Sequence, residues 1–135
     1  MRVIIDTNCL IASIPPQNPE YWLYLAFRNK AFDWVISNEI FLEYEEVTGD
    51  FYSPHTADLV LNILLTVPNV IRSEPYIRWQ LITEDPDDNK FSDLAISANV
   101  HYLVTNDHHF NVLKQLPFPT VKVVSLAEFQ EIMGY

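Results

Sequence analysis

Glycine, cysteine and long apolar segments are scarce in this sequence, and each scarcity excludes a class of protein. Only two of the 135 residues are glycine while 49% are hydrophobic, so the chain is neither disordered nor of low complexity. The single cysteine, Cys9, cannot form an internal disulfide, which favours a reducing cytoplasm. No apolar run approaches the roughly 18 residues of a membrane span, and Asp6 interrupts the N-terminus too early for a signal peptide. We therefore expect one cytoplasmic domain, residues 1–135, with no membrane partner.

Basic residues are also few. The chain has 8 Lys and Arg against 18 Asp and Glu, which gives a formal charge of −10. A protein that binds nucleic acid through its own surface usually has the opposite sign. The acidic excess suits a protein whose clustered carboxylates hold divalent cations, or one that meets a basic partner chain.

Short apolar segments without strict alternation predict buried strands, and helical patterns separate them. A strand that is apolar on both faces is covered by helices on both sides. The expected strands are 3–5, 33–36, 69–71, 102–105 and 121–124. The expected helices are 19–29, 38–48, 54–66 and 89–100, followed by a short helix that ends near residue 115. A last helix is expected to begin with a capping box at 125–128. Gly49 is expected to end the second helix, and Leu59 to lie on the core face of the third. This order predicts a three-layer α/β/α sandwich with a central, mainly parallel sheet.

Two carboxylates are expected at the edge of that sheet where ligands bind. Asp6 follows the first strand, and Asp107 lies two residues past the strand that ends at Thr105. The carboxyl ends of parallel strands are the usual ligand sites of such folds. Each residue also has a structural alternative: Asp6 as a turn residue and Asp107 as the start of a helix after a β-turn.

Two further acids are placed by helical geometry. Glu43 falls at the margin of the buried face of its helix, with the alternative of ordinary solvation. Asp88 heads the buried stripe of the helix from Asn89, although it could simply cap that helix. Asp93, on the same helix, is expected to face water. One α/β topology would thus gather Asp6, Glu43, Asp88 and Asp107.

Four clustered carboxylates do not all stay ionised unless cations lie between them. An all-oxygen ligand set suits Mg²⁺ or Mn²⁺ and not zinc. Carboxylate-bound ions can hold a phosphoryl group and activate water. The phosphates of a substrate would then bind the ions, and the protein would need no basic surface.

Four segments, 3–8, 36–47, 85–91 and 102–107, resemble the successive motifs of PIN-domain ribonucleases, most nearly the VapC-related toxins of bacterial toxin–antitoxin systems. The resemblance implies an α/β/α fold and RNA cleavage that depends on Mg²⁺ or Mn²⁺. It implies an antitoxin protein as partner. The acidic quartet of the family falls on Asp6, Glu43, Asp88 and Asp107, and its supporting polar residues fall on Asn8 and Thr105.

A second hypothesis is a PIN-like module that binds a partner protein, such as a small basic antitoxin, without turnover. A phosphoacceptor domain is less favoured. The aromatic helix 21–27 and the helix 59–67 are expected either to pack in the core or to form a homodimer surface. His108 and His109 are expected to be exposed loop residues, and Lys90, Arg72 and Arg78 to be solvated, with contact to RNA as the alternative.

Overall fold

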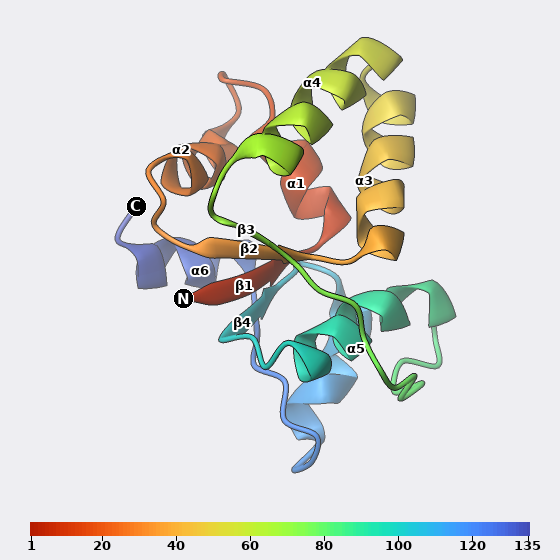
Figure 1. Ribbon diagram of the computed structural model, residues 1–135. Coiled ribbons are helices and arrows are strands. Elements are labelled where there is room, and N and C mark those ends of the chain that lie inside the picture. Colours follow the sequence, from red (N-terminus) through yellow and green to blue (C-terminus); the bar gives the residue numbers. More distant parts are fainter.

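The computed structural model, which describes residues 1–135, contains one sheet of five parallel strands in the order β3-β2-β1-β4-β5 (Figure 1). The strands are β1 (Arg2–Ile5), β2 (Asp33–Ile36), β3 (Val70–Arg72), β4 (Tyr102–Val104) and β5 (Val123–Val124). All five were expected from the sequence, and the parallel α/β architecture is confirmed. The residues Val3, Ile4 and Ile5 of the central strand are fully buried, because helices cover both faces of the sheet.

The helices form the outer layers. Figure 1 shows α1, α2, α3 and α4 on one side of the sheet and α5 on the other, while α6 returns to contact α2. Their bounds are α1 (Thr7–Ser13), α2 (Trp22–Arg28), α3 (Asn38–Phe51), α4 (Pro54–Thr66), α5 (Asn89–Ser97) and α6 (Leu126–Met133), with 3₁₀ turns η1 (Pro19–Tyr21), η2 (Pro86–Asp88) and η3 (His108–Gln115). The predicted capping box at Ser125 and Glu128 is present. No helix combines the length and apolarity needed to span a membrane.

Two sequence predictions about α3 and α4 were wrong. Helix α3 continues through Gly49 to Phe51 instead of ending there. Gly49 lies where α3 packs against α4, and a Cβ at this position would be 4.0 Å from the Cβ of Ala57. Gly49 therefore lies within α3, where a Cβ would be in ordinary contact with α4, and it is not a terminator. Leu59 is 54% exposed, because Ala57, Leu61 and Leu64 form the buried face of α4.

The strand order places β1 at the point where the topology reverses. From β1 the chain moves outward to β2 and β3, and it then crosses back to add β4 on the other side of β1. The carboxyl ends of β1 and β4 therefore border the switch point, where open α/β sheets bind ligands. Asp6 follows β1 and Asp107 follows β4. The backbone N–H of Asp6 donates to the Val104 carbonyl at 2.9 Å, which continues the pairing of the two strands.

Candidate functional site

Asp6 is held in a fixed orientation at the end of β1. Its carboxylate is buried, with 6% of the residue exposed. One oxygen accepts from the Thr7 N–H at 2.8 Å, and the other accepts from the Thr105 hydroxyl at 2.7 Å. Burial raises the pKa of Asp6, the two hydrogen bonds oppose this, and the charges of Glu43 and Asp107 raise it further. Asp6 also caps α1, a short helix that the sequence analysis missed because it follows β1 without a loop.

Asp107 is tied to Asp6 through Thr105. The Thr105 hydroxyl donates to Asp6 and accepts from the Asp107 N–H at 3.0 Å. The Asp107 carboxylate then accepts from the His109 N–H at 2.9 Å, which opens η3. The structure thus brings Asp6 and Asp107 together with Thr105 between them, whereas Asn8 is exposed.

Asp88 faces the same region from the start of α5. Its side chain makes no capping hydrogen bond; Asp85 instead accepts from the Asp87 N–H at 3.2 Å. Burial raises the pKa of Asp88 to about 7, and the charges of Asp85, Asp6 and Asp107 add to the effect. Its Oδ2 atom is buried and has no hydrogen-bond partner. The structure therefore does not support the capping alternative for Asp88.

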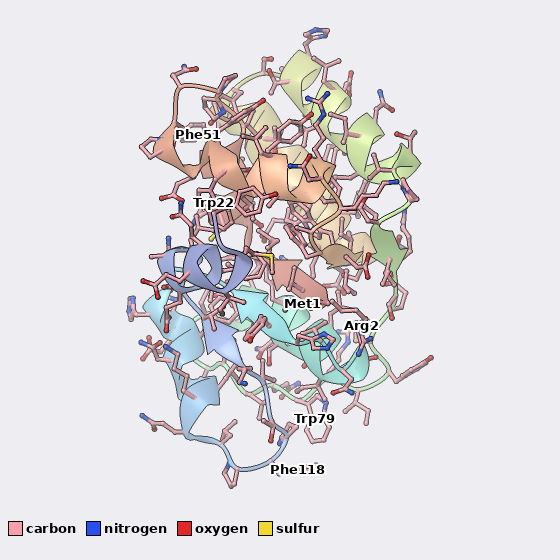
Figure 2. All side chains as sticks on the ribbon, turned by 90° about the vertical axis from the view of Figure 1, so that its left-hand side faces the viewer. Met1, Arg2, Trp22, Phe51, Trp79 and Phe118 are labelled. Carbon is pink, nitrogen blue, oxygen red and sulfur yellow. The ribbon has the colours of Figure 1, made fainter.

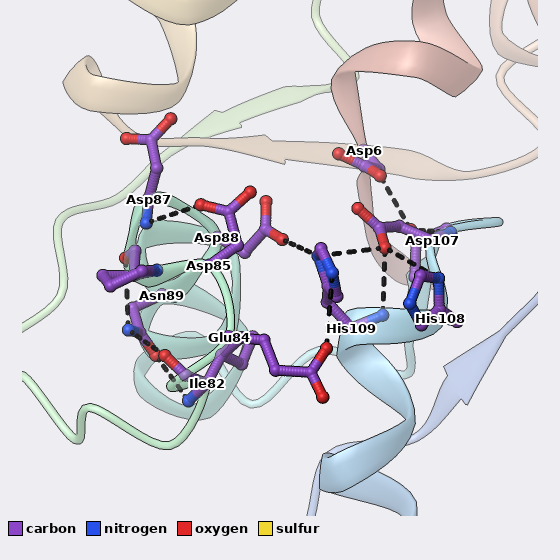
Figure 3. A network of polar contacts seen from close by, with 12 residues as sticks. Asp6, Ile82, Glu84, Asp85, Asp87, Asp88, Asn89, Asp107, His108 and His109 are labelled. Atoms are coloured by element: carbon purple, nitrogen blue, oxygen red, sulfur yellow. Dashed lines mark hydrogen bonds and ion pairs between the residues drawn. The ribbon is translucent and has the colours of Figure 1, made fainter.

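His109 is a member of the cluster that the sequence analysis missed. Its Nδ1 lies 3.3 Å from Asp107 Oδ1 and 3.6 Å from Asp88 Oδ2, and its Nε2 lies 3.3 Å from Glu84 Oε2 (Figure 3). The prediction of an exposed loop residue is wrong for His109, whose side chain is 27% exposed, and correct for His108, at 79%. The available signal was its position two residues past Asp107, which a tight turn brings back over the carboxylate.

Glu43 lies beside this group but is paired with a cation. Its Oε1 is 2.6 Å from Lys90 Nζ, and its Oε2 accepts a hydrogen bond from the Thr7 hydroxyl. Lys90 also contacts Asp87 at 2.9 Å. Although burial opposes its charge, hydrogen bonds to Glu43 and Asp87 raise the pKa of Lys90. The prediction that Lys90 is solvated was wrong, since its side chain is 11% exposed; Arg72 and Arg78 are exposed as expected.

Asp93 does not face water, contrary to the sequence prediction. It is 5% exposed, and its carboxylate accepts from the Trp79 N–H at 3.0 Å. The cause is the segment 73–85, which has no helix or strand and passes over α5. Trp79 of this segment packs against Phe118, with ring centroids 6.2 Å apart, and Figure 2 shows the two rings at the same end of the molecule.

The structure contains a polar and an apolar cavity, and the polar one borders some of these residues. A polar cavity of about 720 Å³ is bordered by Lys90, Asp87 and Asp93. An apolar cavity of about 260 Å³ lies between α1, α2 and α4 and is lined by Leu10, Tyr24, Trp34, Val60 and other side chains. Residues of both helices considered for a homodimer surface line this second cavity.

The donor set fits a divalent cation. The ligand atoms of Asp85, Asp88 and His109 all lie within 4.8 Å of one another. Asp6 and Asp107 are close enough that their charges raise the pKa of Asp88. Carboxylates that oppose one another's ionisation, together with the unpartnered Asp88 Oδ2, are what a cation would satisfy.

A family model described as the PIN domain matches residues 2–109. The structure of VapBC2 from Rickettsia felis bound to a DNA fragment from their promoter is similar in fold, with a TM-score of 0.64. That match has 20% identity and covers 93% of this chain and 98% of the other. No curated protein matches the chain in sequence. The family model matches well over half of the residues, and the matched range includes β1, β4 and the acids Asp6, Glu43, Asp88 and Asp107. This chain therefore belongs to the PIN-domain family.

Proposed function

We propose that this protein is a metal-dependent endoribonuclease that hydrolyses RNA phosphodiester bonds at the carboxyl edge of β1 and β4. The observation that carries the proposal is the gathering of Asp6, Asp88 and Asp107 from three distant segments, with the pKa values of Asp6 and Asp88 raised. Clustered groups with perturbed pKa values are typical of catalytic sites. Members of the PIN-domain family are generally nucleases, which agrees with this chemistry.

Asp6, Asp88 and Asp107 would hold Mg²⁺ or Mn²⁺ through carboxylate oxygens. When bound, such an ion supplies charge neutralisation at a phosphate and lowers the pKa of water. Thr105 orients Asp6 through its hydroxyl and Asp107 through the Asp107 N–H. Glu43 completes the proposed acidic set from a position fixed by Thr7 and Lys90. No side chain in this arrangement needs to act as a nucleophile.

The proposal is tested by incubating single-stranded RNA with the protein and either Mg²⁺ or Mn²⁺. Cleavage is expected with the ions and not with a chelator. Asp6→Asn is expected to lower the rate at least about 100-fold, because it removes a charge from the ion site. Asp58→Asn, an exposed position on α4, is the matched control and is expected to keep the wild-type rate. Equal rates for wild type and Asp6→Asn would show that the site is wrongly assigned.

As a part of the same proposal, the protein is the toxin of a toxin–antitoxin pair. The −10 charge suits a basic partner, and the apolar cavity between α1, α2 and α4 offers such a partner a surface for aliphatic side chains. Coexpression with the product of the adjacent gene is expected to yield a stable complex and to suppress RNA cleavage. A homodimer of this chain through the same face is the competing outcome. The molecular mass of the purified species in solution distinguishes the complex with a partner from the homodimer.

One observation favours the second hypothesis, a partner-binding module without turnover. Lys90 already neutralises Glu43, so the acidic set needs less charge from metal ions than four free carboxylates would. This hypothesis expects tight complex formation and no metal-dependent cleavage, so the RNA assay separates it from the first.

A further inference from the structure

The imidazole of His109 faces carboxylate oxygens on the side of Nδ1. Asp107 Oδ1 is 3.3 Å away and Asp88 Oδ2 is 3.6 Å away. Neither Nδ1 nor Asp88 Oδ2 has a hydrogen-bond partner, and neither atom is accessible to solvent. Such a pair of buried, unsatisfied polar atoms is costly unless something lies between them.

The opposite ring nitrogen lies near a further carboxylate, since His109 Nε2 is 3.3 Å from Glu84 Oε2. On the other side of the ring, Nδ1 faces Asp88 Oδ2 and Asp107 Oδ1 without a hydrogen bond to either. A cation coordinated by Nδ1 and by Asp88 Oδ2 would give both buried atoms the partner that they lack. Figure 3 shows the side chains of Asp85, Asp88, Asp107 and His109 directed toward this common region.

We propose that His109 Nδ1 is a direct ligand of the divalent ion, together with Asp88 and Asp85, whose ligand atoms lie within 4.8 Å of that of His109 and of each other, and that the site therefore selects a transition ion such as Mn²⁺ over Mg²⁺. The inference rests on the metal site of the proposed function. Mg²⁺ strongly prefers oxygen donors, whereas imidazole nitrogen suits first-row transition ions. Glu84, 3.3 Å from Nε2, would be the positioning residue behind the ring, a role that carboxylates commonly have beside a ligating histidine.

The experiment is pulsed electron paramagnetic resonance on the full chain loaded with Mn²⁺. Wild type is expected to show the coupling of a directly bound ¹⁴N nucleus, which changes to the ¹⁵N pattern when histidine is isotopically labelled. His109→Gln is expected to lose the coupling and to weaken Mn²⁺ binding about tenfold or more. Its effect on Mg²⁺ binding, measured by competition, is expected to be clearly smaller.

The other histidines provide the controls. His108→Gln changes the exposed neighbour, and His55→Gln changes an exposed residue in the first turn of α4; both are expected to retain the nitrogen coupling. His101 accepts from the Arg2 N–H at the amino end of β1, the opposite edge of the sheet from Asp6. If His109→Gln does not fold, a variant with Gln at positions 55, 101 and 108 keeps His109 alone and is expected to keep the signal.

The proposal is overturned if Mn²⁺ bound to wild type shows no nitrogen coupling, or if the coupling persists in His109→Gln. It is also overturned if Mg²⁺ and Mn²⁺ bind equally well to wild type. Failure of the ribonuclease proposal looks different: nitrogen-coupled Mn²⁺ would bind normally, and RNA would stay intact in its presence.

Discussion

At the scale of single residues, Thr105 contacts two acids of the cluster through one hydroxyl. Its hydroxyl donates to the buried Asp6 carboxylate and accepts from the Asp107 N–H, so one group orients both acids. A histidine two positions beyond Asp107 then completes the cluster. The chemistry proposed for the site would thus depend on Thr105 through its contacts, although its side chain carries no charge.

Thr105→Val keeps the shape of the side chain and removes the hydroxyl. We expect a loss of about 1–3 kcal/mol in unfolding free energy, because Asp6 and the Asp107 N–H lose a buried partner. Mn²⁺ affinity should fall about 10-fold or more, since the carboxylates lose their orientation. Urea denaturation and metal titration measure the two effects. Thr66→Val, at an exposed position of α4, should change neither, and an unaffected Thr105→Val would contradict the role assigned to the hydroxyl.

Asp88 should make the metal-free protein less stable as pH rises. Its pKa is raised to about 7 from the ordinary aspartate value of 3.8, so between these values the native state binds more protons than the unfolded state. The contribution of Asp88 to the free energy of unfolding is therefore complete below the unfolded-state pKa. It is lost as the pH rises toward the raised native-state pKa. Asp88→Asn should raise the melting temperature of the metal-free protein at about pH 8 and have little effect at about pH 4. Thermal melts in chelator check this; a destabilised Asp88→Asn at the higher pH would contradict it.

At the scale of elements, α3 and α5 are joined by the pair of Glu43 and Lys90, at 2.6 Å and largely buried. Lys90→Met should leave Glu43 without its cation and cost about 3 kcal/mol of unfolding free energy. The double variant with Glu43→Gln should recover part of the loss, because no buried charge is then unpaired. Lys114→Met, at an exposed position, is the control. Chemical denaturation of wild type, Lys90→Met, Glu43→Gln and the double variant gives the coupling energy, and strictly additive effects would contradict an interacting pair.

The elements also show what sequence reasoning could and could not reach. Buried strands and capped helices carry local signals, so all five strands and the capping boundaries of α4 and α6 were predictable. Helix α1 was not, because it is short and starts directly after β1. The segment 73–85 has no periodicity, so its contact with Asp93 could not be foreseen. Lys90 was missed because its partner Glu43 is distant in sequence. His109 lies only two residues past Asp107, but its contacts with Glu84 and Asp88 depend on the path of a distant segment.

At the scale of the whole molecule, the net charge of −10 means that the metal-free protein repels itself. Added NaCl should therefore raise its melting temperature modestly by screening. Mn²⁺ at matched ionic strength should raise it further, because binding to the native state stabilises by mass action. Asp107→Asn should remove the Mn²⁺-specific part and keep the response to NaCl. Equal responses to the two salts in wild type would indicate that the ion acts only through screening.

At the same scale, the topology carries Asp6, Asp88 and Asp107 to one edge of the sheet, where we propose that they share a divalent ion. The most direct measurement is a crystal structure of the protein soaked in Mn²⁺, with anomalous diffraction recorded to locate the metal. The expected result is a single strong anomalous peak within bonding distance of the carboxylates of Asp6, Asp88 and Asp107. The absence of an anomalous peak among these three side chains after soaking in saturating Mn²⁺ would contradict the proposed ion site. Mn²⁺ bound only elsewhere on the acidic surface would also contradict it.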